Sequence, residues 1–390
     1  MKNQLRELDR MLGSAMAQLL SPGSQADSGR PLPPLADVKR VLLVRLDSIG
    51  DMVLTTPLLR ELRRNLRQAE ITLVVRPAVQ DLVALCPYVD RVLPYADADA
   101  RPRSALLAVA HASRFRRRHW RSESFDLALL PRWEDDAGFS SVLARMSRAT
   151  RRVGYQGTAR LTHAPSSGPE LHEATRNLEL IRLLGGTVDD DQLELWIDAA
   201  DHAFATDLLA AHRVGSHDFV LAIGPGAGHP RRRWPLDRFA EVGAWSLSHN
   251  AGFVLVVGGA DERAMGNELR SRLGPRVINA AGLATLRGTA ALLQRSTLFV
   301  GNDSGSMHVA AGVGVPVVEV SCHPEGGAPA HPNSPIRFAP WRVPHRIARP
   351  DVAVAPCVDA CASDGPHCIS TVPAATVTTQ VTHLLTEKVV

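Results

Sequence analysis

The chain of 390 residues contains no run of about 18–20 apolar residues, the length that a membrane-spanning helix requires. Its N-terminus also lacks the basic and then apolar layout of a secretory signal. Cysteine is scarce: the five residues are an odd number, and Cys86 and Cys322 are isolated in the sequence. This distribution does not fit the disulfide framework of a secreted protein. We therefore expect a cytoplasmic protein, with association at the inner face of a membrane left open.

Two common nucleotide-binding fingerprints are also missing. The chain has neither the Gly-x-x-x-x-Gly-Lys-Ser/Thr phosphate loop nor a Gly-x-Gly-x-x-Gly segment with an acidic residue at the required distance. The second absence counts against a nucleotide-sugar epimerase or dehydrogenase built from two Rossmann domains.

The composition is that of a globular protein, with 45% hydrophobic and 22% charged residues. The length suits two domains of about 100–200 residues each. The net charge of +4 hides one basic cluster, and this cluster favours an anionic partner other than nucleic acid. A solvated helix face without a ligand is the alternative. The cluster consists of Arg101, Arg103, Arg114, Arg116, Arg117, Arg118 and Arg121.

Four regions follow one another along the chain. Residues 1–37 predict a helical arm and a flexible tether; the arm could pack on the body, on a second subunit of a homo-oligomer or on a membrane surface. Residues 38–200 and 201–372 each alternate short apolar runs with segments of helical period, which predicts two α/β domains with parallel sheets. A C-terminal helix is expected at about 373–387.

The clearest buried strands end in loops with unusual residues. The strands are predicted at 41–46, 71–75, 126–130, 219–223, 253–257, 298–300 and 315–320. In open α/β sheets, ligands bind beyond the carboxyl ends of the strands.

After the first strand, Gly50 relaxes a corner and Asp51 lies in the first turn of a helix predicted at 51–66, where the helix dipole favours an ionised carboxylate. A plain helix cap is the alternative interpretation.

Three loops of the second domain suit a nucleotide. "GPGAGHPRRRWP" (224–235) joins a glycine corner that includes Gly226 to three arginines, whose guanidinium groups suit phosphate. In "NDSGSMH" (302–308), Asp303 and Ser304 could cap a helix whose first N–H groups bind an anion, with His308 one turn further on. Asp261 and Glu262 follow a strand, and either carboxylate could bind ribose hydroxyls or simply start a helix.

Taken together, the motifs closely resemble glycosyltransferase family 9, the heptosyltransferase family of lipopolysaccharide core assembly. The resemblance runs from about Val38 to the C-terminus and also includes "RRVGY" (151–155) and "HEATRNLELIRLLG" (172–185). Its four main motifs, in chain order, are "RLDSIGDMVLTTPLLRELR", "PGAG" followed by "RRRWPLDRFAEV", "GGADE" and "VGNDSGSMHVAAGVGVPVV".

The resemblance implies a GT-B fold, with an N-terminal acceptor domain and a C-terminal nucleotide-sugar domain facing a central cleft. It implies an inverting transfer, most often of heptose from ADP-heptose, to a hydroxyl of an anionic or lipid-linked glycan. Asp51 matches the family's general base, and Arg116, Arg117 and Arg118 are candidates for binding the acceptor. The donor would contact Gly226, Arg232, Glu262, Asp303, Ser304, Gly305 and His308.

This sequence departs from the family pattern in three places. Arg232 stands where the family usually has a lysine, Gly224 replaces a frequent histidine before "PGAG", and Ser306 replaces a frequent proline. A nucleoside diphosphate leaves as a stabilised anion, so one carboxylate base suffices for the transfer. No Asp-x-Asp pair is placed to hold a metal on the diphosphate, and we expect no catalytic metal and no cofactor.

Cys357, Cys361 and Cys368, with His367 alongside, lie in a loop before the C-terminal helix. The spacing leaves open a zinc or iron site, a loop with reduced thiols, or a disulfide. The main alternative to an enzyme is a non-catalytic family member that binds nucleotide sugar or acts as a scaffold. The presence of Asp51 argues against that alternative.

Overall fold

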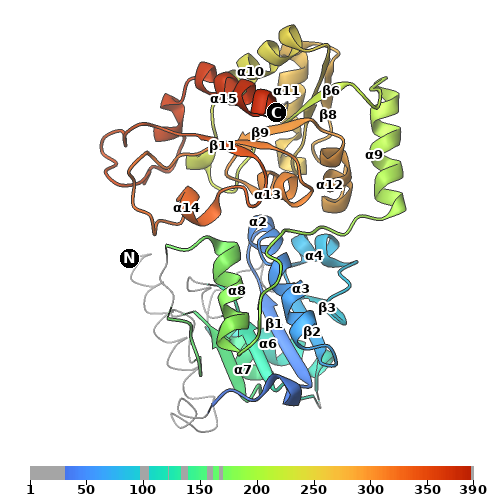
Figure 1. Ribbon diagram of the computed structural model, residues 1–390, viewed down its shortest axis with the longest axis vertical. Helices are drawn as coiled ribbons and strands as arrows, with labels where there is room; N and C mark the ends of the chain where they lie inside the picture. The colour runs from blue at the N-terminus through green and yellow to red at the C-terminus, as the bar shows by residue number, and fades with distance from the viewer. Residues whose placement is uncertain are drawn as a thin grey trace. The chain divides into compact units, whose positions relative to one another are not determined.

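The computed structural model describes residues 31–96, 105–121, 123–132, 139–155, 161–166 and 170–387. The predicted helical arm at residues 1–20, together with Arg101 and Arg103, lies outside this part. The chain divides into two compact units (Figure 1). The first comprises Met1–Ser48, Thr55–Gly168 and Ala174–Asp191, and the second comprises Ile49–Leu54, Pro169–Glu173 and Gln192–Val390. Each unit therefore contains segments from more than one part of the chain, whereas the sequence predicted one boundary near residue 200.

The first unit is built on a parallel sheet with the strand order β3-β2-β1-β4-β5. Its inner strands are apolar along their whole length because helices cover both faces of a parallel sheet. In β1 every residue after Arg40 is buried. The strands are β1 (Arg40–Arg45), β2 (Glu70–Val75), β3 (Arg91–Pro94), β4 (Leu127–Leu130) and β5 (Arg151–Gly154).

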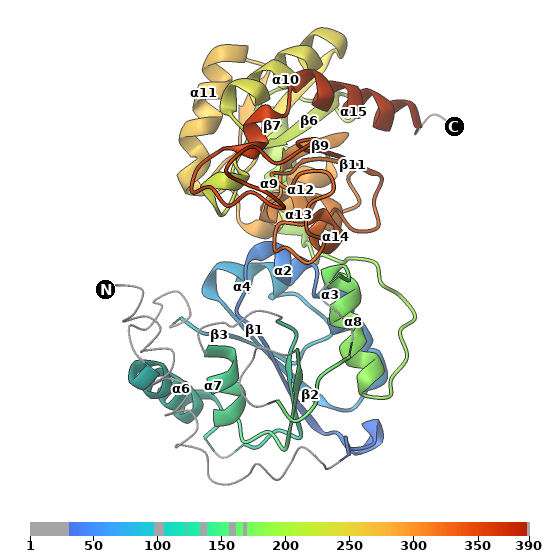
Figure 2. The same cartoon turned by 90° about the vertical axis from the view of Figure 1, so that its left-hand side faces the viewer.

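Figure 2 shows two groups of helices around this sheet, with α6 and α7 on one side and α3 and α8 on the other. Phe115 and Trp120 are buried with α7 residues in the core under α6, and their rings meet edge to face at 5.1 Å. The helices of the unit are α3 (Thr56–Asn65), α4 (Pro77–Val83), α6 (Ala105–His119), α7 (Phe139–Met146) and most of α8 (Glu173–Leu183), with a short 3-10 turn at Leu35–Asp37.

The helix predicted at 51–66 is in fact two helices. The first is α2 (Ile49–Val53), and α3 then begins at Thr56 with Pro57 in its first turn. Proline has no N–H and its ring clashes with the preceding turn, so it is tolerated at the start of a helix but not inside one. The break separates Asp51 from the first unit, because residues 49–54 make their contacts in the second unit.

The second unit also has a parallel sheet, with the strand order β11-β10-β9-β6-β7-β8. The sequence predicted the four central strands and missed the short edge strands β8 and β11. The strands are β6 (Phe219–Gly224), β7 (Gly252–Val256), β8 (Val277–Asn279), β9 (Leu298–Asn302), β10 (Val317–Val320) and β11 (His345–Ala348).

Helices α10, α11 and α15 lie together on one face of this sheet (Figure 2). The C-terminal helix α15 forms where the sequence predicts it, and Val377, Val381 and Leu384 bury its apolar face. No helix of the described residues is long and apolar enough to cross a membrane. The helices are α9 (Ala199–Ala211), α10 (Leu236–His249), α11 (Arg263–Leu273), α12 (Leu286–Gln294), α13 (Gly305–Gly312), α14 (Pro335–Phe338) and α15 (Ala374–Glu387), with 3-10 turns at Pro230–Arg232, Ala260–Glu262 and Cys368–Thr371.

The core of the second unit contains one unusual carboxyl group. Glu319 lies in β10, where the two flanking residues are Val318 and Val320, and it is 1% exposed. Burial raises the pKa of Glu319 well above its ordinary value of 4.5, and the nearby charge of Asp303 raises it further. Glu319 is therefore a buried acid that keeps its proton to a higher pH in the folded protein than in the unfolded chain.

Replacing Glu319 should change how stability depends on pH. The folded protein keeps the Glu319 proton above the pH at which the unfolded chain releases it. The free energy of unfolding therefore falls as the pH rises from about 4.5 toward the raised pKa. Glu319→Gln removes this contribution of up to about 1.4 kcal/mol per pH unit. In urea titrations, the free energy of unfolding of the variant should therefore rise relative to that of the parent as the pH rises.

Glu325→Gln is the matched control, because the carboxyl group of Glu325 is 62% exposed. The free energy of unfolding of Glu325→Gln should depend on pH in the same way as that of the parent. Parallel curves for the parent and Glu319→Gln would contradict the assignment of a buried proton to this side chain.

Candidate active site

Helix α2 packs closely on α13 in the second unit. A Cβ atom at Gly50 would lie 2.4 Å from Cδ2 of His308, and a Cβ atom at Gly305 would lie 2.8 Å from Cβ of Ile49. Atoms at those separations would clash, so the two helices approach each other only because both positions are glycine. The contact brings Asp51, the next residue after Gly50, to the donor-side motif that the sequence predicts.

Asp51 is half-buried and lies within electrostatic reach of two predicted donor residues. Asp303 has the largest effect in raising the pKa of Arg232, and Asp51 adds to it. Burial is the main influence on His308 and lowers its pKa, while Asp303 and Asp51 act in the opposite direction. The structure thus places Asp51, Arg232, Asp303 and His308 in one electrostatic cluster.

The three arginines of the 224–235 loop have different partners. Arg231 Nη1 donates to the carbonyl oxygen of Cys361 at 3.2 Å, and Arg233 Nε donates to the carbonyl oxygen of Ala227 at 3.1 Å. Arg232 Nη1 donates to Asp303 Oδ2 at 3.1 Å, while the Nε atom of Arg232 is buried and has no hydrogen-bond partner among the described residues. Of the three arginines, Arg232 is the one that Asp303 holds at the start of α13, and its Nε–H group can still donate a hydrogen bond.

Ser304 occupies the N-cap position of α13, but its side chain makes no capping hydrogen bond. Its Oγ atom instead lies 3.0 Å from Oγ of Ser306. Asp303, the other residue that could have capped the helix, is ion-paired with Arg232. The predicted side-chain caps are therefore wrong, and the first N–H groups of α13 are not satisfied by these two residues. Such groups favour an anion.

Asn302 organises the loops around this cluster, and sequence reasoning gave it no role. Its side chain is fully buried. Oδ1 accepts from the backbone N–H of Trp234 at 3.0 Å, and Nδ2 donates to the carbonyl oxygens of Pro225 and Gly226 at 2.8 and 3.2 Å. One amide thus joins both ends of the 224–235 loop to the carboxyl end of β9. A polar residue at the end of an apolar strand was the signal that could have identified it.

Glu262 and Asp261, which the sequence could not separate, differ in the structure. Asp261 is exposed. The Glu262 carboxylate accepts from the N–H of Gly259 at 2.8 Å, and a Cβ atom at Gly226 would overlap it at 1.4 Å from Oε1. Burial raises the pKa of Glu262. Gly226 thus provides the space into which Glu262 points.

His308 is 3% exposed, and its ring lies on the backbone of Gly50. Its Nδ1 atom is buried without a hydrogen-bond partner among the described residues. Because burial lowers its pKa, His308 favours the neutral form. A neutral ring can present either a donor or an acceptor to a ligand.

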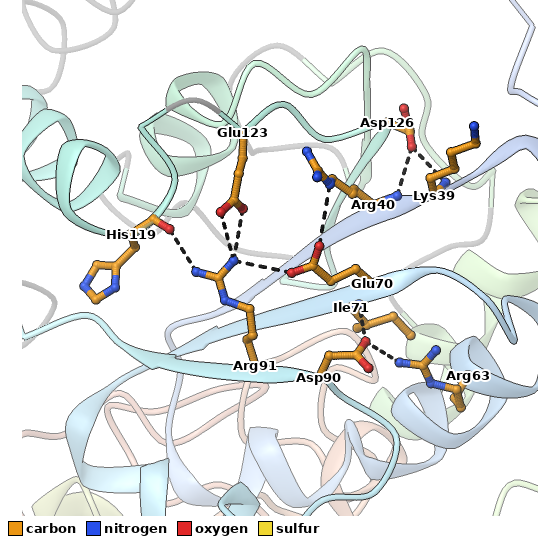
Figure 3. Close-up of polar contacts among 10 residues, drawn as sticks. All are labelled: Lys39, Arg40, Arg63, Glu70, Ile71, Asp90, Arg91, His119, Glu123 and Asp126. Carbon is orange, nitrogen blue, oxygen red and sulfur yellow. Dashed lines mark hydrogen bonds and ion pairs between the residues drawn. The ribbon is translucent and has the colours of Figure 1, made fainter.

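The predicted acceptor residues Arg116, Arg117 and Arg118 occupy the last turn of α6, which belongs to the first unit. Arg117 and Arg118 are exposed, and Arg116 is half-buried. The segment that follows α6 is attached to the amino ends of the strands (Figure 3).

The attachments in Figure 3 fix the direction of α6. Arg91, the first residue of β3, donates to the carbonyl oxygen of His119 at 2.8 Å and to Glu123 at 3.0 Å. Asp126 accepts from the backbone N–H of Arg40, the first residue of β1, at 2.9 Å. Ligands bind at the opposite, carboxyl edge of such sheets, so this placement argues against the predicted acceptor role of the α6 arginines.

The carboxyl edge of the first sheet carries a different charged group. Asp47 follows β1 and is 8% exposed. Arg45 Nε lies 3.2 Å from Asp47 Oδ2, and Arg132, which follows β4, forms an ion pair with the same carboxylate. Sequence reasoning overlooked this group, although an arginine inside the apolar run of β1 was a visible signal.

Comparison with known proteins now identifies the chain. The family model of "Glycosyltransferase family 9 (heptosyltransferase)" matches residues 114–322, more than half of the 390 residues. The chain belongs to glycosyltransferase family 9. Lipopolysaccharide heptosyltransferase 2 of Salmonella typhimurium is 25% identical to it over 291 residues, which cover 72% of this chain and 81% of that protein.

Solved structures of similar proteins show the same fold. A family 9 glycosyltransferase from Veillonella parvula matches with a TM-score of 0.72 and 20% identity, covering 90% of this chain and 98% of that one. The ADP-heptose heptosyltransferase II of E. coli matches with a TM-score of 0.66 and 19% identity, covering 90% and 100%. The two parallel sheets of this family 9 protein are thus those of a GT-B fold, as the sequence predicted.

The departure from the family pattern at Gly224 has a local explanation. A Cβ atom there would lie 2.6 Å from Cζ of Phe299 and 2.8 Å from Oγ of Ser306. This family 9 chain therefore has no room for a side chain at Gly224 while Phe299 and Ser306 keep their positions. The two departures are therefore neighbours in the structure, because the side chain of Ser306 lies where a side chain at Gly224 would point.

Asn302→Leu should destabilise the second unit while keeping the approximate size of the side chain. The change leaves the Trp234 N–H and two carbonyl groups without their buried partner, and an unsatisfied buried group costs about 1–3 kcal/mol. We expect the free energy of unfolding to fall by at least about 2 kcal/mol in urea titrations.

Asn250→Leu is the control, because the half-buried Asn250 side chain donates only one hydrogen bond, to the carbonyl oxygen of Ser246 at 3.3 Å. Asn250→Leu should lower the free energy of unfolding clearly less than Asn302→Leu does. Equal losses from the two variants would show that Asn302 does not organise the loops.

Proposed function

We propose that this chain is an inverting heptosyltransferase that moves heptose from ADP-heptose to a hydroxyl group of a glycan such as a lipopolysaccharide core. The observation that carries the proposal is the position of Asp51 beside the Arg232–Asp303 pair. A carboxylate base and a phosphate-binding cation are the two groups that such a transfer requires, and both lie in the second unit. Family membership and the heptosyltransferase relative support the choice of sugar.

The second unit is proposed to bind the donor. Arg232 is oriented by Asp303 and would direct its remaining N–H groups at the diphosphate. The first N–H groups of α13, reached across Gly305, would bind the same phosphates because the start of a helix carries partial positive charge. Glu262 would accept hydrogen bonds from the ribose hydroxyls, and Gly226 leaves the space for this.

The transfer itself needs one base. Asp51 would take the proton of the acceptor hydroxyl while its oxygen attacks the anomeric carbon from the face opposite the diphosphate. The bond between the anomeric carbon and the phosphate oxygen breaks, and its electron pair leaves with the ADP. Arg232 and the N-terminus of α13 would stabilise the charge that develops on the leaving oxygen. The mechanism inverts the anomeric centre and assigns no step to a metal ion.

The first unit is proposed to bind the acceptor at the carboxyl edge of its sheet. Arg132 is 24% exposed there while it pairs with the buried Asp47, so its guanidinium can meet an anionic group of the acceptor. The α6 arginines lie at the other edge of the sheet and are not assigned to the acceptor. An anionic or lipid-linked glycan remains the proposed class of acceptor.

Arg232→Ala should weaken the binding of ADP. Hydrogen bonds to charged groups contribute about 1.5–3 kcal/mol each, which corresponds to a loss of roughly 10- to 100-fold in affinity. A thermal-shift screen of the parent with ADP, GDP, UDP and dTDP should first show the largest stabilisation with ADP. At about 100 times the dissociation constant, a ligand adds about 2.7 kcal/mol.

Two further variants sharpen this test. Arg232→Lys keeps the charge and should retain more affinity than Arg232→Ala. Arg270→Ala removes an exposed arginine of α11 and should bind ADP as the parent does. Unchanged ADP affinity in Arg232→Ala would refute the role of this loop, and a clear preference for another nucleotide would refute the choice of ADP.

Asp51→Asn should abolish most of the transfer activity while keeping the fold. The amide preserves the shape of the side chain, so we expect a stability loss of at most about 1 kcal/mol. Loss of the base should lower turnover by roughly 10²- to 10⁴-fold. ADP affinity should stay constant or rise slightly, because a negative charge near Arg232 is removed. Turnover and ADP affinity are measured on one folded preparation.

Asp237→Asn is the control, since Asp237 is also an acidic residue in the first turn of a helix and is paired with Arg272. It should keep the parent's turnover. Turnover of Asp51→Asn within about threefold of the parent would show that Asp51 is not the base. A separate outcome, a parent that binds ADP but has no turnover, would support the non-catalytic alternative.

A further inference from the structure

A cluster of four side chains lies in the loop between β11 and α15, outside the proposed active site. The four side chains are those of Cys357, Cys361, His367 and Cys368. Their sulfur and nitrogen atoms all lie within 4.8 Å of one another. The loop belongs to the second unit, and Cys361 and Cys368 are fully buried there.

Two nitrogen–sulfur distances within the cluster match the spacing expected between the ligands of one tetrahedral ion. Nδ1 of His367 lies 3.7 Å from Sγ of Cys357 and 3.5 Å from Sγ of Cys368. Bond lengths of about 2.3 Å to sulfur and about 2.0–2.1 Å to nitrogen place a sulfur and a nitrogen ligand about 3.6 Å apart in a tetrahedron. The imidazole of His367 therefore already stands at the spacing from two of the thiols that such an ion needs, and the third thiol lies within 4.8 Å of the other ligand atoms.

Backbone N–H groups support the sulfur atoms from outside the cluster. The N–H of Ala362 donates to Sγ of Cys357 at 3.4 Å, and the N–H of Val354 donates to Sγ of Cys368 at 3.5 Å. Such hydrogen bonds orient ligands and stabilise thiolates, so they are the expected surroundings of a metal–thiolate site. They also show that the backbone, and not only the side chains, is arranged around the sulfur atoms.

A disulfide accounts less well for this arrangement. The five cysteines are all free in the structure, and one disulfide would use two of the three clustered thiols while leaving the third and the imidazole without a function. Reduced thiols alone would not require three sulfur atoms and a histidine nitrogen to converge on one point. A single ion uses all four ligands.

We propose that Cys357, Cys361, His367 and Cys368 bind one thiophilic divalent metal ion, for which zinc is the best match. Three thiolates and one imidazole form a standard ligand set of structural zinc sites. Each thiol would release its proton on binding, while His367 binds through Nδ1 as the neutral imidazole. The ion makes no contact with the substrates in this proposal.

The position of the site indicates what the ion does. The carbonyl oxygen of Cys361 accepts a hydrogen bond from Nη1 of Arg231, the residue next to Arg232. The indole N–H of Trp234 donates to the carbonyl oxygen of Val372 at 3.0 Å, a few residues after Cys368. An ion that fixes the 357–368 loop would therefore also hold the 224–235 loop in place.

The first experiment measures the metal content of the full-length protein, purified without chelators, by elemental analysis. We expect close to one zinc or iron ion per chain in the parent. Cys357→Ser and His367→Gln should each lose most of it, and both positions lie outside the fully buried part of the cluster. Cys86→Ser is the control: it removes a buried thiol in the first unit and should keep the ion.

A second measurement needs no variant. Removal of the ion from the parent should lower its melting temperature, and cobalt(II) added to this protein should give thiolate charge-transfer absorption with the visible bands of a tetrahedral site. The proposal is overturned if the parent holds no more metal than Cys357→Ser, if cobalt(II) gives no charge-transfer band, or if mass spectrometry finds a disulfide within the cluster. None of these readouts depends on transferase activity, so the donor assignment could fail while this site stands.

Discussion

The close contact between α2 and α13 is the constraint on which the proposed chemistry depends. Two glycines, Gly50 and Gly305, remove the side chains that would hold these helices apart. The ring of His308 then fills the space on the backbone of Gly50, and Asp51 comes within the electrostatic reach of Arg232. An acidic base and a basic phosphate ligand would attract each other if both were free to move. Asp303 reduces this attraction because it holds Arg232 in its own ion pair.

The loops that surround this contact are fixed by groups that do not themselves act on substrate. Asn302 ties the 224–235 loop to the end of β9, and Glu319, whose pKa is raised by burial, lies in the neighbouring strand β10 near Asp303. A second ionised carboxylate beneath Asp303 would compete for Arg232, whereas a protonated one does not. The raised pKa of Glu319 favours its protonated form and so weakens this competition, and Asp303 is the carboxylate that is ion-paired with Arg232.

The sequence predicted most of the fold because buried parallel strands are continuous apolar runs. The edge strands β8 and β11 have only three and four residues, and three of the four residues of β11 are half-buried, so neither gives a long apolar run. The break at Pro57 was readable from the chemistry of proline. The position of the α6 arginines could not be predicted from charge: the contacts of Arg91 with His119 and Glu123 show that the end of α6 lies at the amino edge of the sheet. Likewise, the sequence alone cannot distinguish Glu262 from Asp261 as a ligand. The structure distinguishes them, because the Glu262 carboxylate occupies the space that Gly226 leaves open.

The path of the chain between its units has a consequence for attempts to divide the protein. Residues 49–54 belong to the second unit although they lie far before its main segment, which begins at Gln192. A fragment that starts at Gln192 would contain the whole second sheet and the 224–235 loop. It would lack α2, leave the glycine surface of α13 uncovered, and lose Asp51. A single cut would therefore give a fragment with the proposed nucleotide contacts but without the proposed base. A circularly permuted or co-expressed chain would be needed to restore both.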